Sequence, residues 1–245
     1  MAGIDYIFGI RTCTEAIISG KEIDKVLIKK GLSGPLFQEL FKLINKESIP
    51  FQFVPAEKLN RISKKNHQGV ITFISPITYY KIEQLIPSIF ENGENPLFLI
   101  LDGITDIRNF GAVARTALCA NVHGIIIPDR GSAQINADAI KTSAGALLEI
   151  PVCRSANLGN TIKYLQQSGI KIIAATEKAS EIYYNVEMCG PTAIIFGSEE
   201  KGIFEGNLKL CDKQVRIPVS EKIGSLNISV AAGIMVFEAI RQRTS

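Results

Sequence analysis

Short blocks of apolar residues recur along the chain, and their spacing alternates between helical and strand-like periods. Before residue 76, helical spacing marks IRTCTEAIISG and GPLFQELFKLINKESI. The segments KVLIKK, FQFV and GVITFIS are typical of strands, and AEKLNRIS is a further short element. These elements predict a small α/β domain over residues 1–75.

The segment SPITYYKIEQLIPSIFENGENP breaks this pattern, because it contains three prolines, Gly93 and a mixture of polar and apolar residues. We expect a linker with a short helix over residues 76–95.

From Pro96 onward, strand-like blocks alternate with helix-length segments. The blocks are PLFLILD, HGIIIPD, IKIIAAT, AIIFGS and QVRIPV, and they are rich in β-branched residues. Near-continuous apolar strands separated by helices are typical of a parallel sheet that is covered on both faces. Residues 96–245 are therefore predicted to form a second domain of α/β class with a mostly parallel sheet.

The composition fits a globular protein outside the membrane. Of the 245 residues, 46% are hydrophobic and 21% charged. No uninterrupted apolar run reaches the roughly 18 residues that a membrane span needs, and the amino terminus lacks a basic start followed by an apolar core. We expect a soluble, cytoplasmic protein that does not bind membranes.

Metal chemistry has few candidate ligands in this sequence. The five cysteines are widely spaced and form no CxxC pair, and only His67 and His123 are present. We therefore predict no metal site and a reducing compartment. The net charge of +3 is compatible with nucleic acid but does not require it.

Three strand ends carry candidate chemistry, because parallel sheets bind ligands outside the carboxyl ends of their strands. After PLFLILD, Asn109 is expected to cap a helix, and Gly111 allows close backbone approach. Arg115 lies one turn beyond Gly111, where it either pairs with an acid on a neighbouring element or holds a phosphate or carboxylate.

The other two strand ends are ambiguous when taken singly. GSEEKG, with Glu199 and Glu200, is either a surface turn or part of a site. In EKIGSLNISVAAG, capping needs one polar residue, whereas Ser225, Asn227 and Ser229 are all present. The chain contains neither GxxxxGK[ST] nor GxGxxG, so the usual nucleotide-phosphate loops and a nicotinamide dehydrogenase are not indicated.

Together, NFGAVARTA, IIFGSEEKGI and IPVSEKIGSLNISVAAGIMVFEA resemble, in order and spacing, the three motifs of the SpoU (TrmH) family of RNA ribose 2′-O-methyltransferases. The first domain, which ends in KKNHQGVI, resembles the L30e-like substrate-binding domain of bacterial enzymes that methylate a guanosine of 23S rRNA. The resemblance implies a deep trefoil knot of the SPOUT type in residues 96–245. It also implies S-adenosylmethionine as the cofactor, and a homodimer packed through the knotted domains.

The resemblance also assigns roles to individual residues. The implied catalytic residues are Asn109, Arg115, Glu199, Ser225 and Asn227, and the implied contacts to S-adenosylmethionine are Gly197, Ile217 and Leu226. Since a guanidinium stays protonated in proteins, we expect Arg115 to bind the phosphate beside the target ribose rather than to act as a base. Ser229 is interpreted as a packing residue.

RNA contacts are expected in EKLNRISKKNHQG, through Arg61, Lys64, Lys65 and His67. The alternative is a solvated charged loop. Two other functions remain open: 2′-O-methylation of tRNA or of another rRNA nucleotide, and a non-catalytic RNA-binding assembly factor.

Overall fold

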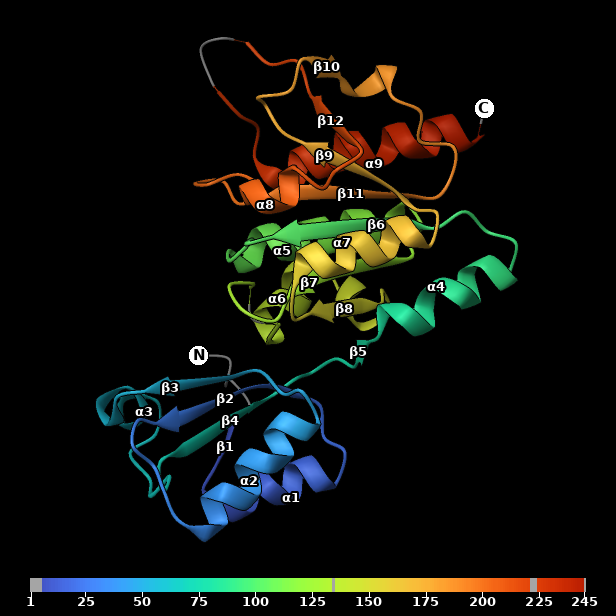
Figure 1. Ribbon diagram of the computed structural model, residues 1–245. Coiled ribbons are helices and arrows are strands. Elements are labelled where there is room, and N and C mark those ends of the chain that lie inside the picture. The colour runs from blue at the N-terminus through green and yellow to red at the C-terminus, as the bar shows by residue number, and fades with distance from the viewer. Residues whose placement is uncertain (1–5, 134, 221–223, 245) are drawn as a thin grey trace. The chain divides into compact units, whose positions relative to one another are not determined.

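The computed structural model describes residues 6–133, 135–220 and 224–244, in two compact units. Unit 1 comprises Met1–Thr78 with Ile135–Ala137, and unit 2 comprises Tyr79–Gln134 with Asp138–Ser245. Figure 1 shows the elements of each unit. None of the helices in the described ranges is long and apolar enough to cross a membrane.

Unit 1 is a four-stranded sheet with helices, in the strand order β1-β4-β2-β3. Its elements are β1 (Tyr6–Phe8), α1 (Ile10–Ile18), β2 (Ile23–Lys29), α2 (Pro35–Lys46), β3 (Phe51–Val54), α3 (Ala56–Ile62) and β4 (Val70–Ile74). Alternate residues of β2 contribute to two cores: Val26 and Ile28 pack with α1 and α2, and Leu27 packs with Leu59 of α3. Every element expected from the sequence is present, whereas the three-residue β1 was not predicted.

Unit 2 contains an eight-stranded sheet in the order β10-β12-β9-β11-β6-β7-β8-β5, and each pairing in it is parallel. Its strands are β5 (Tyr79–Tyr80), β6 (Leu97–Asp102), β7 (Gly124–Pro128), β8 (Val152–Ser155), β9 (Lys171–Ala175), β10 (Glu181–Ile182), β11 (Thr192–Gly197) and β12 (Lys213–Arg216). The five predicted strands are confirmed. The sequence missed β5 and β10, which have only two residues each, and β8, whose VCRS sequence interrupts the apolar pattern.

Helices cover both faces of this sheet, as the apolar strands predict. In Figure 1, α7 lies in front of the sheet and α5 and α9 lie behind it. The helices of unit 2 are α4 (Ile82–Glu91), α5 (Ile107–Cys119), α6 (Ala137–Thr142), α7 (Leu158–Gln167), α8 (Glu205–Leu208) and α9 (Ile228–Thr244), with short 3₁₀ turns at Ala146–Leu148 and Tyr183–Asn185. Phe98 and Ile100 of β6 pack with α4 and α7, and the intervening Leu99 is also fully buried. The predicted knot concerns how the chain is threaded, and it stays a prediction.

The expected linker is shorter than predicted, because residues 79–95 lie within unit 2. Strand β5 pairs with β8, and Ile82, Ile86 and Ile89 of α4 are buried in the core of the sheet domain. The prolines in this segment were read as signs of a linker. However, Pro87 lies inside α4, and the apolar spacing of the helix binds it to the domain.

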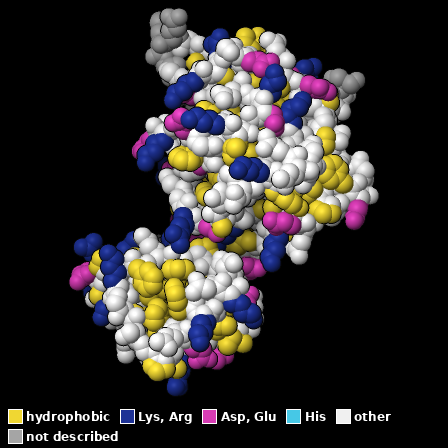
Figure 2. Space-filling model, viewed as in Figure 1, with side chains coloured by type: hydrophobic (Ala, Val, Ile, Leu, Met, Phe, Trp, Pro, Cys, Tyr) yellow, Lys and Arg dark blue, Asp and Glu magenta, His cyan; other side chains and the backbone are white. Residues whose placement is uncertain are grey.

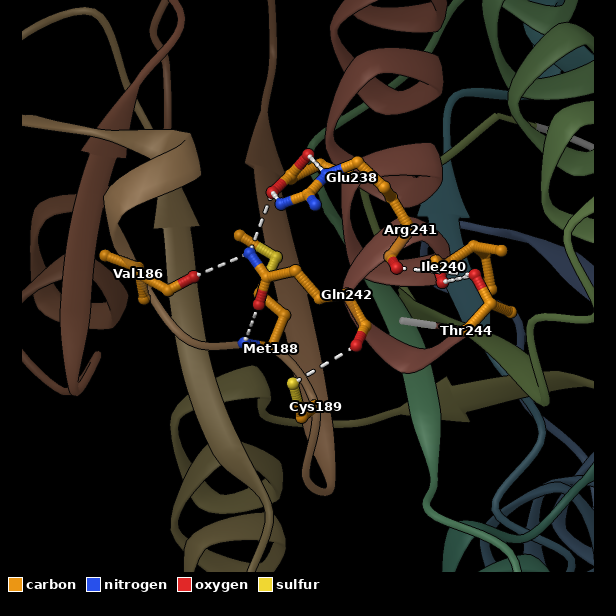
Figure 3. Close-up of polar contacts among 8 residues, drawn as sticks. All are labelled: Val186, Met188, Cys189, Glu238, Ile240, Arg241, Gln242 and Thr244. Carbon is orange, nitrogen blue, oxygen red and sulfur yellow. Dashed lines mark hydrogen bonds and ion pairs between the residues drawn. The ribbon is translucent and has the colours of Figure 1, made fainter.

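The carboxyl end of α9 is fixed to the loop that precedes β11. Figure 3 shows Gln242 beside this loop, where its amide nitrogen Nε2 donates to the Val186 carbonyl. The distance is 3.1 Å. Its Oε1 accepts from the Met188 N–H at 2.7 Å. Arg243 donates further bonds to four backbone carbonyls, those of Asn95, Pro96, Met188 and Gly190. The helix is therefore anchored at its last turn by side-chain bonds to backbone groups.

Candidate functional site

The candidate site lies at the carboxyl ends of neighbouring parallel strands. Strands β12, β9, β11 and β6 are adjacent, so their ends meet at one edge of the sheet. A pocket opens there between the segments that follow β9, β11 and β12. Its lining consists of Ala175–Lys178, Phe196–Ile203, Ile217, Val219, Gly224–Leu226, Ile228 and Ala231. Five residues proposed from the sequence are among them: Gly197, Glu199, Ile217, Ser225 and Leu226.

Gly197 occupies a position where no side chain fits. A Cβ atom there would lie 1.9 Å from the carbonyl carbon of Gly202 and 2.0 Å from the nitrogen of Ile203. The two chain segments approach so closely because Ser198 and Gly202 form a bridge, with the Gly202 N–H donating to the Ser198 carbonyl at 2.8 Å. The resulting tight turn carries Glu199 at the mouth of the pocket.

Asp102, the last residue of β6, holds the segment that leads away from this turn. Its Oδ2 accepts from the Phe204 N–H at 2.9 Å and from Nδ2 of Asn207 at 3.0 Å. These two bonds attach the start of α8 to the end of β6. Asp102 was not among the residues predicted from the sequence, although it ends the strand block PLFLILD.

Three side chains from three different elements meet beside the pocket. Asn109 of α5 donates from Nδ2 to Oε1 of Glu199 at 3.0 Å. Asn227, directly before α9, donates from Nδ2 to the same oxygen at 3.0 Å and to Oδ1 of Asn109 at 2.9 Å. One oxygen of the carboxylate thus accepts from two side-chain amides, which fixes its position. We call these three residues the amide–carboxylate network.

The cap of α5 differs from the prediction. Asp106 caps the helix and accepts from the backbone N–H of Asn109 at 2.8 Å. Asn109 is therefore a residue of the first turn, and its side chain is available for Glu199. The expectation that Asn109 caps the helix is wrong, because Asp106, three residues earlier, is the cap and accepts from the backbone N–H of Asn109. Gly111 has the expected close approach, although to the backbone nitrogen of Ser143, which would lie 3.0 Å from an added Cβ.

Asn227 has the geometry of a helix cap in addition to its place in the network. Its carbonyl accepts from the Ala231 N–H at 3.0 Å, and its Oδ1 accepts from the Ser229 N–H at 2.9 Å. The hydroxyl of Ser229 donates to the same Oδ1 at 2.6 Å. Ser229 therefore makes a specific polar contact, which its interpretation as a packing residue did not include.

Arg115 is an exposed cation on α5. Among the residues that the structure describes, it forms no hydrogen bond or ion pair. The alternative in which Arg115 pairs with a neighbouring acid is not supported. Arg115 does not line the pocket, and neither do Asn109 and Asn227. The structure thus joins Asn109, Glu199 and Asn227, places Ser225 in the pocket, and leaves Arg115 outside both groups.

The residues proposed for RNA contacts lie on α3 and in the loop that follows it. Arg61, Lys64 and Lys65 are exposed. His67 has a different position, because both of its ring nitrogens bind within the unit: Nδ1 accepts from the Gly69 N–H at 3.0 Å, and Nε2 lies 2.8 Å from Oδ1 of Asn60. Since Nδ1 is the acceptor, Nε2 carries the proton and donates to Asn60. His67 therefore shapes this loop.

Sequence reasoning missed the segment after β9. Thr176, Glu177 and Lys178 line the pocket directly beyond the strand, and Glu177 and Lys178 are exposed. The same strand-end rule that identified the other segments would have found them, because IKIIAAT is followed by these polar residues. Glu177 and Lys178 add one charge of each sign to the pocket, beside the charged turn residues Glu199–Lys201 and the apolar side chains of Ile217, Leu226 and Ile228.

Cys211 has no nucleophilic role in this region. Burial, followed by the nearby carboxylates of Asp212 and Asp102, raises the pKa of its thiol to about 12. Its Sγ donates to the Asn207 carbonyl at 3.3 Å. The thiol therefore stays protonated near neutral pH, and the chemistry of the site rests on amides, carboxylate, hydroxyl and cation.

A parallel sheet with a pocket and a polar network at its carboxyl edge defines an α/β enzyme that binds its ligand at the strand ends. The chain belongs to the SpoU rRNA methylase family, which matches residues 96–237. Residues 6–80 match the substrate-binding domain of RNA 2′-O ribose methyltransferases. The class of enzyme expected from the three motifs, an RNA 2′-O-ribose methyltransferase of this family, is thereby confirmed, as is the SPOUT-type α/β fold class.

Similar proteins match nearly the whole chain. YacO of Bacillus subtilis (strain 168), assigned to the TrmH family of tRNA/rRNA methyltransferases, is 33% identical over 98% of this chain and 96% of its own. The AdoMet-bound rRNA methyltransferase of Sinorhizobium meliloti shares the fold, with a TM-score of 0.63, 22% identity and coverage of 98% of this chain and 88% of its own. This relative was solved with the cofactor expected for the family.

A third structure is similar over part of the chain. The TrmH/SpoU tRNA modifying enzyme of A. aeolicus has a TM-score of 0.56 and 25% identity, and it covers 66% of this chain and 84% of its own.

Proposed function

We propose that this protein binds S-adenosylmethionine in the strand-end pocket and methylates a ribose 2′-hydroxyl of RNA, with a guanosine of 23S rRNA as the favoured target. The observation that carries the proposal is the pocket itself, which brings Gly197, Ile217 and Leu226 together beside the amide–carboxylate network. Main-chain groups near Gly197 and apolar surface at Ile217 and Leu226 suit an adenine ring.

The residues of the pocket fit the remaining parts of this cofactor. S-adenosylmethionine supplies an electrophilic methyl group, together with a ribose diol, an ammonium and a carboxylate. Glu177 and Lys178 provide one charge of each sign at the rim. The carboxylate of Glu199, which also lines the pocket, suits a cationic ligand.

Arg115 is proposed to bind the phosphate next to the target ribose. Its exposure and its lack of an ion pair among the described residues make a bidentate phosphate contact possible without breaking an existing bond. A fixed positive charge also stabilises an oxygen that becomes more negative as it loses its proton. Ser225, exposed in the pocket, is proposed to hold the 2′-hydroxyl, and water or a phosphate oxygen takes the proton.

A homodimer through unit 2 is part of the proposal. Along one face of α9, Val230 is 50% and Phe237 51% exposed, with Ile234 partly exposed between them. Exposed apolar side chains at this helical spacing favour burial against another surface. A second copy on the α5 and α9 surface would also bring a further chain near Arg115.

The choice of rRNA over tRNA rests on unit 1. Residues 6–80 match a substrate-binding domain of RNA 2′-O ribose methyltransferases, whereas the tRNA modifying enzyme of A. aeolicus covers only 66% of this chain. Basic side chains do not decide the question: on the face in Figure 2, Lys and Arg are scattered among acidic residues. The contacts to RNA are proposed at Arg61, Lys64 and Lys65.

Mapping of ribose 2′-O-methylation in RNA tests the function. Ribosomal and transfer RNA from cells with and without the gene are compared, and the deletion is complemented with the wild-type gene or with Arg115→Ala. We expect one 23S rRNA guanosine to lose its methyl group and only the wild-type gene to restore it. If a tRNA nucleotide loses its methyl group instead, the proposed reaction stands but its target is tRNA. No lost site, together with no binding of S-adenosylmethionine by calorimetry, would favour a non-catalytic RNA-binding factor.

A further inference from the structure

We propose that Ser229 is a positioning residue for methyl transfer, which acts by orienting the side chain of Asn227. The inference rests on the proposed function, because Asn227 belongs to the network beside the pocket. The observation behind it is the bond from the Ser229 hydroxyl to Oδ1 of Asn227, which at 2.6 Å is at the short end of the range for hydroxyl donors.

The hydrogen bonds around Asn227 define the orientation of its amide. Oδ1 accepts from the backbone N–H and from the hydroxyl of Ser229, so two donors lie on the oxygen side. Nδ2 donates to Oδ1 of Asn109 and to Oε1 of Glu199, so two acceptors lie on the nitrogen side. A rotation of the amide by half a turn would place oxygen against oxygen and N–H against N–H. Four contacts therefore favour a single orientation.

The hydroxyl of Ser229 exceeds what a helix cap requires. The backbone N–H of Ser229 already provides the bond that a cap normally makes, at 2.9 Å. Alanine at this position would keep that bond and the start of α9, and it would remove only the hydroxyl. The second donor on Oδ1 also polarises the amide, which strengthens the bonds that Nδ2 donates. The hydroxyl of Ser229 is thus expected to affect the amide–carboxylate network and not the stability of the fold.

The network leads from Ser229 to the pocket. Both amides bind Oε1 of Glu199, while Oε2 has no hydrogen-bond partner in the described part of the chain. Glu199 lines the pocket, so a carboxylate held at one oxygen presents the other to a ligand. Loss of the Ser229 hydroxyl would let Asn227 rotate, and the direction of Oε2 would become less well defined.

Four variants test the inference: Ser229→Ala, Ser229→Thr, Asn227→Ala and the double variant Asn227→Ala with Ser229→Ala. The measurements are kcat, KM for RNA and for S-adenosylmethionine, and melting temperature. We expect Ser229→Ala to lower kcat about three- to tenfold, the range of one lost hydrogen bond, with both KM values unchanged. Ser229→Thr keeps a hydroxyl and should restore the rate. The double variant should match Asn227→Ala alone.

The matched control is Ser88→Ala. Ser88 is an exposed helix serine of α4, and its hydroxyl also makes one hydrogen bond, to the Leu85 carbonyl at 2.8 Å. It should leave kcat unchanged. A wild-type rate for Ser229→Ala, or a further loss in the double variant, would overturn the inference.

A readout without RNA separates this inference from the proposed function. The side-chain amide of Asn227 gives its own signals in a ¹⁵N–¹H spectrum, and the Asn227→Ala variant assigns them. We expect Ser229→Ala to shift these signals and Ser229→Thr to leave them nearly in place. If the wild type methylates no RNA but the signals shift, the proposed function fails and the positioning of Asn227 stands. Unshifted signals would contradict the positioning itself.

Discussion

The positive charge of Arg115 is available for binding a ligand. It is exposed on α5, and none of the described acidic side chains pairs with it. Arg115→Ala is therefore expected to fold normally and to lower kcat by about 100-fold or more, the usual scale for loss of a group that stabilises developing charge. Arg115→Lys keeps the charge but loses the two-pronged geometry, so its rate should fall between those of Ala and the wild type.

The pH profile of Arg115→Lys distinguishes a fixed positive charge at this position from a general base. A fixed charge predicts the same profile as the wild type, at a lower rate. Near-normal turnover with a strongly displaced optimum would instead identify a titrating base. Arg108→Lys on the same helix is the control, because Arg108 is exposed there as well and is expected to keep the wild-type rate.

For single residues, the sequence predicted which residues lie at the site better than it predicted their hydrogen-bond partners. Gly197, Ile217 and Leu226 were proposed from motifs and do line one pocket. The bonds from Asn109 and Asn227 to Glu199 were not predictable, because they form only once α5, the turn after β11 and the start of α9 are in place. One polar residue too many at the start of α9 was the only signal in the sequence.

Among the elements, α3 and its following loop carry the proposed RNA contacts of unit 1. Lys64→Glu with Lys65→Glu should weaken RNA binding and flatten its salt dependence. The slope of log K against log salt should fall by about 0.7–0.9 for each phosphate contact that is lost. Filter binding over a range of salt concentrations measures both quantities.

Lys21→Glu with Lys42→Glu is the matched control for this loop. Both lysines are exposed in the same unit, outside α3 and its loop, so the change in net charge is the same. Equal weakening by the two pairs would indicate a general charge effect and would refute a local contact. Asn60→Ala should also disturb binding, because Asn60 bonds to His67 and holds the loop.

Element boundaries followed from the sequence where apolar periodicity was strong. Strands β6, β7, β9 and β11 of unit 2 were predicted because each is buried on both faces, and burial leaves a near-continuous apolar run. The cap of α5 was assigned to the wrong residue, since Asp106 and Asn109 are both good caps and only the structure shows which N–H group is bound. The short helix expected in residues 76–95 is present as α4, but its prolines suggested a linker, whereas its three buried isoleucines pack it into the core of unit 2.

For the molecule as a whole, Arg243 anchors the last helix, α9, to the rest of unit 2. Its guanidinium donates to four backbone carbonyls, and burial lowers its pKa. Arg243→Ala would leave these carbonyls without their donor, at a cost of about 3 kcal/mol in the free energy of unfolding. Arg243→Lys should recover little of this stability, because one ammonium group cannot reach all the carbonyls that the planar guanidinium contacts.

Arg241→Ala is the control in the same turn of α9. Arg241 pairs with Glu238 (Figure 3). The distance is 2.8 Å and the Arg241 side chain is 64% exposed, so its loss should cost less than about 1 kcal/mol. Urea unfolding of the three variants measures the difference. Equal losses for Arg241→Ala and Arg243→Ala would show that the backbone contacts of Arg243 do not anchor the helix.

The proposed homodimer predicts a difference between two exposed thiols. Cys119, at the end of α5, and Cys189 are exposed, whereas burial raises the pKa of Cys13 to about 11 and of Cys153 to about 12. Because alkylating reagents attack the thiolate, the exposed pair should react first in a single chain. If the α5 and α9 surface pairs with a second copy, Cys119 becomes covered, and its reaction slows relative to that of Cys189.

Iodoacetamide labelling, read by peptide mass spectrometry, measures the two rates at protein concentrations where light scattering reports the oligomeric state. Phe237→Asp places a charge in the apolar face of α9, so it should yield monomers and restore fast labelling of Cys119. Cys189 serves as the internal reference in every sample. A dimer in which Cys119 reacts as quickly as in Phe237→Asp would exclude the α5 and α9 surface as the interface, because a covered thiol cannot keep the reactivity of an exposed one.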